Sequence, residues 1–61
     1  MNGRRVTVWV WGKTIKIETD QLLKTKWRAS GEYMGEVHQS EDRTEDQAMR
    51  RWIEWATTKG G

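Results

Sequence analysis

Very few side chains of this sequence are suited to covalent chemistry. Its 61 residues include no cysteine and one histidine, His38, which lies between Glu36 and Glu41. Nucleophilic catalysis needs a nucleophile, a base and a group that orients the base, and the sequence offers no such set. One histidine without cysteine cannot build a structural zinc site either. We therefore expect a protein that is not an enzyme, with no catalytic residue, metal site, cofactor or small-molecule substrate.

The side chains suited to binding a partner are aromatic and basic. The chain has five tryptophans, and its 11 Lys and Arg residues face 9 Asp and Glu residues. Residues 1–31 hold seven basic and two acidic side chains, whereas residues 32–61 hold four basic and seven acidic ones. This asymmetry favours a basic surface built by the first half of the chain. The alternative is that charges in a small domain fall unevenly by chance.

The length allows one domain, residues 1–61, and limits its stability. A chain of this size buries only roughly 60% of the surface that its unfolded form exposes. The tryptophans must supply much of the core, since each ring can bury about 150–250 Å². The apolar stretch Val6–Trp11 is shorter than a signal peptide, which needs about 7–15 apolar residues, or a membrane span, which needs about 20. We expect no membrane association, and the lack of cysteine makes the cytoplasm the default compartment.

Alternating apolar residues predict a first β-hairpin. From Val6 to Ile17, valine and isoleucine occupy every second position on both sides of Gly12-Lys13. That period is typical of half-buried strands. Glycine in the first central position of a two-residue loop favours a type II′ turn at Gly12-Lys13, which pairs Val10 with Ile15.

A second hairpin and a loop are expected to follow. Residues 25–37 contain two internal glycines, and glycine weakens strand interiors or marks turns. We expect a turn at Ala29-Ser30-Gly31, which sets Trp27 opposite Tyr33 as an aromatic cross-strand pair. Residues 38–43 are polar and predict a loop.

The last third of the chain predicts a helix. Thr44-Glu45-Asp46-Gln47 matches a capping box, and apolar residues at helical spacing follow from Ala48 to Ala56. The sequence thus predicts an α+β fold, an antiparallel β-meander of three or four strands packed on one C-terminal α-helix. The predicted core comprises Val6, Val8, Val10, Ile15, Ile17, Trp27, Tyr33, Val37, Ala48, Trp52 and Ala56.

The residues between these core positions predict an outer sheet face that carries tryptophans among basic side chains. Aromatic rings stack on bases and basic groups pair with phosphates, so this face favours nucleic acid, and DNA in particular, as the partner. The candidate binding residues are Arg4, Arg5, Trp9, Trp11, Lys13, Lys16, Lys26 and Arg28.

Two alternatives apply to the same residues. Another protein, or a second copy of this chain, would also cover exposed apolar side chains such as Trp9, Trp11 and Met34. A purely structural role is the other alternative, for example a cation–π pair of Lys16 with Trp9 that stabilises the hairpin.

Two motifs resemble the end of AP2/integrase-type DNA-binding domains. They are Tyr33-Met34-Gly35 and Thr44-x-Asp46-x-Ala48-x-x-x-Trp52-x-x-x-Ala56, which together cover 24 residues. The resemblance implies a sheet that lies in the major groove, with strand residues on bases and phosphates. The strand positions that correspond by resemblance are Arg4, Arg5, Trp9, Lys16, Lys26 and Arg28. The chain departs from the family in its longer segment from Val37 to Arg43, a possible fourth strand and fewer arginines in the first strand.

Overall fold

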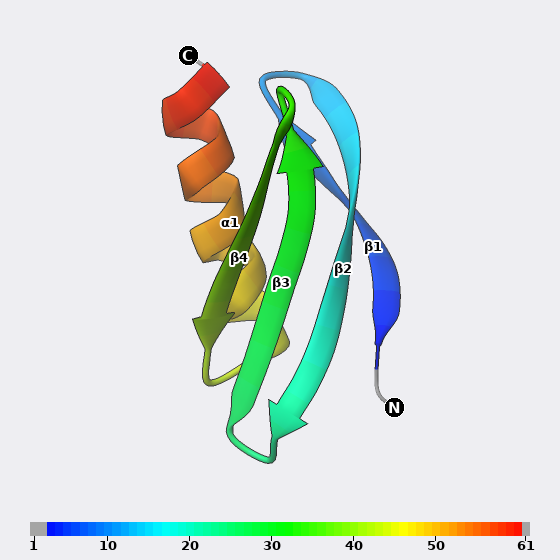
Figure 1. Cartoon of the computed structure of the whole chain (residues 1–61), viewed down its shortest axis with the longest axis vertical. Coiled ribbons are helices and arrows are strands. Elements are labelled where there is room, and N and C mark those ends of the chain that lie inside the picture. The colour runs from blue at the N-terminus through cyan, green and yellow to red at the C-terminus, as the bar shows by residue number, and fades with distance from the viewer. Residues whose placement is uncertain (1–2, 61) are drawn as a thin grey trace.

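Residues 3–60 are described by the computed structural model, in which one α-helix lies against one face of a four-stranded antiparallel sheet (Figure 1). The order of strands in the sheet is β1-β2-β3-β4, so each strand pairs with the next one along the chain. This confirms the predicted α+β meander, with four strands. The elements are β1 (Arg4–Val10), β2 (Lys13–Leu23), β3 (Lys26–Tyr33), β4 (Glu36–Asp42) and α1 (Glu45–Gly60).

The β1–β2 hairpin turns one residue earlier than expected. Val10 pairs with Lys13, and the turn residues Trp11 and Gly12 have φ angles of 53° and 76°. Positive φ at both central residues is the signature of a type I′ turn, so the predicted type II′ turn at Gly12-Lys13 is wrong. Val8 takes the place of Val10 opposite Ile15. Because side-chain direction repeats every second residue, this shift leaves the valines of β1 and the isoleucines of β2 on their predicted face.

Strand β3 runs through the predicted second turn. Ala29-Ser30-Gly31 lies inside β3, and the chain reverses at Met34-Gly35, with φ angles of 54° and 80°. Trp27 therefore pairs with Asp42 rather than with Tyr33. The predicted loop at residues 38–43 is also wrong, because residues 36–42 form β4.

Gly31 stands inside a strand because the core approaches its backbone closely. A Cβ atom at this position would lie 2.6 Å from Cγ2 of Ile17 and 3.1 Å from Cζ2 of Trp52. Glycine in a strand interior often marks such a close approach. Gly31 thus makes room for the indole of Trp52.

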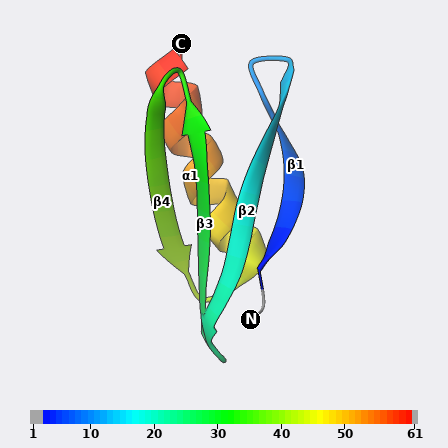
Figure 2. The ribbon, with the colours of Figure 1, turned by 45° about the vertical axis from the view of Figure 1, so that its right-hand side comes forward.

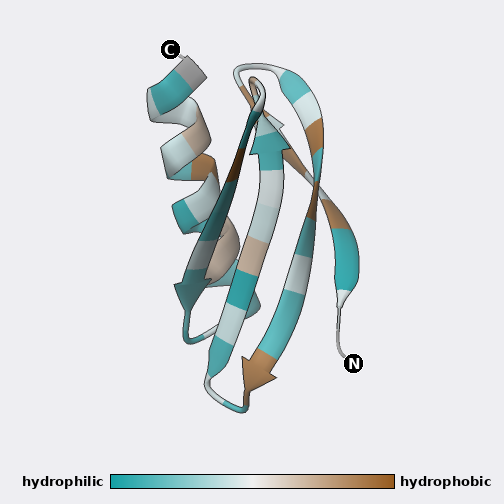
Figure 3. Cartoon of the chain, viewed as in Figure 1, coloured by the Kyte–Doolittle hydropathy of each residue, from teal (hydrophilic) through white to brown (hydrophobic). Residues whose placement is uncertain are grey.

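Trp52 is the largest fully buried side chain of the core. Its ring meets Tyr33 edge to face, with ring centroids 6.4 Å apart, and its Nε1 donates a 3.1 Å hydrogen bond to the carbonyl oxygen of His38. The buried apolar residues are Val8, Val10, Ile17, Ala29, Tyr33, Ala48, Trp52 and Ala56. The predicted core residues Val6, Ile15 and Trp27 are partly buried against this cluster. Along the first half of β2, hydrophobic and hydrophilic residues alternate as the prediction required (Figure 3).

Val37 was assigned to the core, but it is 67% exposed. The two-residue turn at Met34-Gly35 pairs Tyr33 with Glu36 and Glu32 with Val37. Since Tyr33 faces the helix, Glu36 shares that face and Val37 lies on the opposite one.

Helix α1 begins where the sequence predicts. The hydroxyl of Thr44 accepts a 3.1 Å hydrogen bond from the amide of Gln47, which is the expected N-cap contact. The helix packs mainly against β3 and β4, and β1 lies at the opposite edge of the sheet (Figure 2). Within the described residues, no helix is long and apolar enough to cross a membrane.

Candidate functional site

The face of the sheet opposite α1, called the outer face below, carries balanced charges. The pairing of the strands places four basic and four acidic side chains on it: Arg5, Lys16, Lys26, Arg28, Glu18, Asp20, Glu32 and Glu41. The outer face as a whole is therefore not basic. A basic site requires a part of it where the positive side chains are not neutralised.

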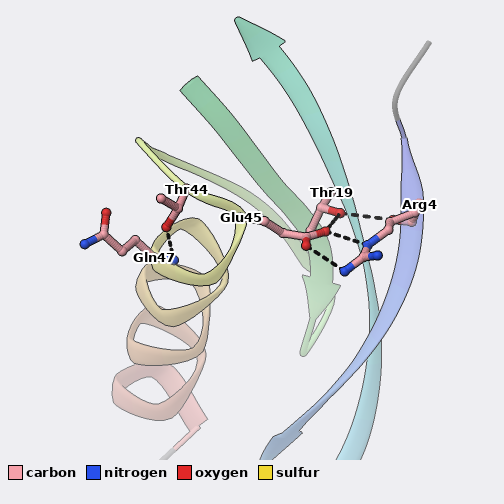
Figure 4. Close-up of polar contacts among 5 residues, drawn as sticks. All are labelled: Arg4, Thr19, Thr44, Glu45 and Gln47. Atoms are coloured by element: carbon pink, nitrogen blue, oxygen red, sulfur yellow. Dashed lines mark hydrogen bonds and ion pairs between the residues drawn. The ribbon is translucent and has the colours of Figure 1, made fainter. Parts of the chain in front are cut away.

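Arg4 does not reach the outer face. Its guanidinium holds Glu45 by two contacts, Nε to Oε2 at 2.7 Å and Nη2 to Oε1 at 2.6 Å (Figure 4). The fully buried Thr19 donates a 2.6 Å hydrogen bond to the same carboxylate. The Thr19 hydroxyl and, next, Arg4 lower the pKa of Glu45 below its usual value of 4.5. Arg4 thus ties β1 to the start of α1.

Trp11 also turns towards the helix. Its Nε1 donates a 2.9 Å hydrogen bond to the carbonyl oxygen of Thr57, one of the last carbonyls of α1. Helix ends leave such carbonyls without partners in the helix, so Trp11 satisfies one of them. Trp9 and Trp11 were expected to share the outer face, but they point to different parts of the molecule. Lys13 is paired with the buried Val10 and lies on the helix-facing side at the end of the hairpin.

Lys26 and Arg28 lie on the outer face but are engaged in ion pairs. Lys26 Nζ is 3.2 Å from Glu41, and Arg28 Nη2 is 3.4 Å from Asp20. The four side chains are partly or largely exposed, so these contacts add little stability. They nevertheless neutralise the part of the outer face formed by β3 and β4.

The remaining basic side chains of the outer face lie on the β1–β2 hairpin. Among residues 3–60, neither Arg5 nor Lys16 forms an ion pair, and Trp9 is 67% exposed. Among residues 3–60 a cation–π contact joins Lys59 to Trp55, and none joins Lys16 to Trp9. We call five outer-face residues of the two strands the hairpin surface: Arg5, Thr7, Trp9, Thr14 and Lys16. The acidic Glu18 lies opposite Arg5 on the same face.

A shallow depression between β4 and α1 offers no comparable chemistry. His38, which was expected in a solvated loop, stacks on Trp55 with ring centroids 4.3 Å apart and an interplanar angle of 9°. Ser40 lines the same depression, but no hydrogen bond joins it to His38 in the described structure. No cluster of ligands for a metal ion occurs among the residues that the structure describes.

Two polar clusters that hold the helix against the sheet were not predicted from the sequence. The first cluster joins Glu45 to Thr19 and Arg4. The sequence assigned Glu45 only to the start of the helix, and it assigned no role to Thr19. The second cluster is Asp42, whose pKa is lowered chiefly by the hydrogen bond from Arg51 and then by the backbone amide of Arg43. Both carboxylates serve the junction of sheet and helix rather than a ligand.

Comparison of the chain with protein-family models, curated proteins and solved structures found no match. The resemblance to AP2/integrase-type domains therefore stays a prediction. Any proposal about function has to come from the geometry of the hairpin surface.

Proposed function

We propose that this domain binds nucleic acid, with DNA favoured, through the hairpin surface. The observation that supports the proposal most is Trp9, a large apolar ring that is 67% exposed on the same face as Arg5 and Lys16, two basic side chains without ion-pair partners in residues 3–60. An exposed ring contributes little to the core, whereas base–aromatic stacking is worth about 1–3 kcal/mol per base.

The shape of the hairpin suits a groove or a single strand. A two-stranded β-ribbon fits the major groove of duplex DNA, where its outward side chains reach base edges. Arg5 and Lys16, which both lie further from the turn than Trp9, would then contact phosphates, and Thr7 and Thr14, opposite Lys16 and Trp9, would offer hydroxyls. Lys26 and Arg28 would contribute less than the sequence predicts, because Glu41 and Asp20 neutralise them.

A salt titration of binding to mixed-sequence duplex and single-stranded oligonucleotides tests the proposal. Lys16→Ala should weaken binding and reduce the slope of log K against log salt by about 0.9 on duplex DNA, since one phosphate contact is lost. The control is Arg50→Ala, which removes an exposed charge on α1, where Arg50 pairs with Asp46. The control should bind as the parent does. Equal weakening by both variants, or no binding by the parent at low salt, would exclude the proposed surface.

A second candidate function, protein–protein contact, has its own supporting observation. The turns at Trp11-Gly12 and Met34-Gly35 lie at the same end of the molecule, beside the end of α1 (Figure 1). Trp11, Met34 and Val37 are 59%, 70% and 67% exposed there. Association through these apolar side chains would persist at high salt, whereas phosphate contacts would be lost, so the same titration separates the two candidates.

A further inference from the structure

Strand β1 is an edge strand whose protection against pairing is confined to its first two residues. Edge strands commonly carry lysines, proline or a β-bulge that discourage added strands. The sequence of β1, Arg-Arg-Val-Thr-Val-Trp-Val, has no lysine or proline, and the register shift of this sheet lies between β2 and β3. Its two charges, Arg4 and Arg5, stand together at one end. The rest of the strand is left open to a partner strand.

The turn geometry determines which backbone groups of β1 are free. In a two-residue hairpin the residues that flank the turn, here Val10 and Lys13, form a hydrogen-bonded pair. Bonded and non-bonded pairs then alternate along the antiparallel ladder. The amides and carbonyls of Arg5, Thr7 and Trp9 therefore point away from β2, towards the open edge.

We propose that β1 pairs antiparallel with β1 of a second copy of the chain, centred on Thr7. In this register Thr7 faces the partner's Thr7, and Arg5 faces the partner's Trp9. Every outward amide and carbonyl of the three residues then finds a partner, because hydrogen-bonded pairs exchange two bonds each. The two sheets become one continuous sheet with both helices on the same face.

The side chains favour this register over its neighbours. Residues directly opposite in an antiparallel pair have Cβ atoms about 4.5–5.5 Å apart, so each Arg5 comes within cation–π range of the partner's Trp9. Antiparallel pairing also keeps the two Arg4-Arg5 ends apart, at opposite ends of the shared ladder. On the helix-facing side the half-buried Val6 meets the partner's Val8, which extends the core across the interface.

The other edge of the sheet is a poorer site for a second copy. Two side chains of α1 hold β4, since Lys59 pairs with Glu36 and Arg51 with Asp42. β4 also has three acidic residues and no lysine or arginine, so two copies of it would repel each other. The hydrogen bonds from the β1–β2 hairpin to α1 come from the side chains of Arg4, Thr19 and Trp11. They leave free the outward backbone groups of Arg5, Thr7 and Trp9, to which a second copy would bind.

The proposal is tested first by sedimentation equilibrium of the free protein over a range of concentrations. The parent and Thr7→Val should sediment at twice the mass of the chain, because the valine keeps the backbone amide. Thr7→Pro removes that amide, which does not bond to β2, and proline is tolerated at such edge positions. It should stay folded and monomeric, with a dissociation constant raised about 100-fold or more, since each copy loses an amide at the centre of the interface. A monomeric parent would overturn the proposal, as would larger assemblies, which head-to-tail pairing of β1 with β4 would produce.

A disulfide tests the register without depending on Thr7→Pro. The chain has no cysteine, so a single introduced thiol can only bridge two copies. Thr7 and the partner's Thr7 form a bonded pair with Cα atoms about 5.5 Å apart, within the range for a disulfide. Thr7→Cys should oxidise to a covalent dimer, whereas Thr14→Cys, on the same face but on β2, should remain monomeric. Equal oxidation of both variants would overturn the register. Because neither experiment includes nucleic acid, their outcome is independent of the proposed function.

Discussion

Trp52 and Trp9 are the same residue type in opposite environments. Trp52 is fully buried against Tyr33 and Trp55 and donates its N–H to a backbone carbonyl, whereas Trp9 is 67% exposed on the outer face. Periodicity alone separates them, because Trp52 falls on the apolar stripe of α1 and Trp9 alternates with the buried valines of β1.

This contrast predicts two very different effects on stability. Trp52→Ala should destabilise the domain by about 3–5 kcal/mol, because it leaves a cavity and an unpaired carbonyl in a small core. Trp9→Ala should change the unfolding free energy of the monomer far less. Thermal melts followed by circular dichroism would measure both at a concentration too low for self-association. Similar losses in the two variants would show that Trp9 is buried in solution.

Arg4 illustrates a residue whose position the sequence could not predict. Its place in β1 was predicted, but its partner Glu45 lies 41 positions further along the chain. The strand pattern assigns Arg4 to the same face as Val6, and only the position of the helix start explains why a charge is tolerated there. Trp11 is similar, since its partner Thr57 is 46 positions away. Both residues were expected at the outer face, and both turn towards the helix instead, because the local pattern does not show which distant group meets them.

At the scale of the elements, the β1–β2 and β3–β4 hairpins both use a turn type that their residues do not indicate. Type I′ turns prefer Asn-Gly or Asp-Gly, because both central residues need positive φ. Here the first positions are Trp11 and Met34, which rarely adopt that conformation. Gly12 was recognised as a turn residue, although the bulky Trp11 before it hid the turn type, whereas Gly35 was placed inside a predicted strand and its turn was missed. Gly31 was predicted to lie in a turn, but it lies inside β3, where the absence of a side chain leaves space for Trp52.

The strain at Met34 leads to a prediction. Its φ of 54° is disfavoured for a long side chain. Because the residue is 70% exposed, side-chain packing offsets little of this strain. Met34→Asn should stabilise the domain by up to about 1 kcal/mol, since asparagine tolerates this backbone conformation. The change would appear as a higher urea midpoint with an unchanged m value. The equivalent Trp11→Asn should not stabilise, because it removes the hydrogen bond to Thr57. A lower midpoint for Met34→Asn would mean that Met34 makes a stabilising contact in solution.

At the scale of the whole molecule, two carboxylates hold the helix to the sheet. Glu45 meets Thr19 and Arg4 from β2 and β1, and Asp42, at the end of β4, meets Arg51 from α1. The pKa values of both carboxyls are lowered below the usual 4.5 and 3.8. A group with a lowered pKa in the folded state stabilises the fold above its unfolded pKa and loses that contribution as pH falls through the folded value.

The domain should therefore lose stability as the pH falls below about 4.5, the usual value for Glu45. Glu45→Gln should destabilise the protein at neutral pH and flatten this acid dependence, because the amide cannot titrate. Urea unfolding at several pH values measures both effects. Glu32→Gln, an exposed change on the outer face, is the control and should leave the acid dependence as in the parent. An unaltered dependence in Glu45→Gln would contradict the role assigned to that carboxylate.

The ties between β1 and α1 also bear on the order in which the chain acquires its structure during synthesis. The strands pair with their neighbours in sequence, so the hairpins can form as soon as they leave the ribosome. Their apolar face, however, stays uncovered until Trp52 and the rest of α1 have been made. At roughly 5–20 residues per second, translation of residues 44–56 leaves that face open for about one to three seconds. A nascent chain that stalls within this interval would present the valines of β1 and an unprotected edge together, which is the state that chaperones bind and that aggregates form from.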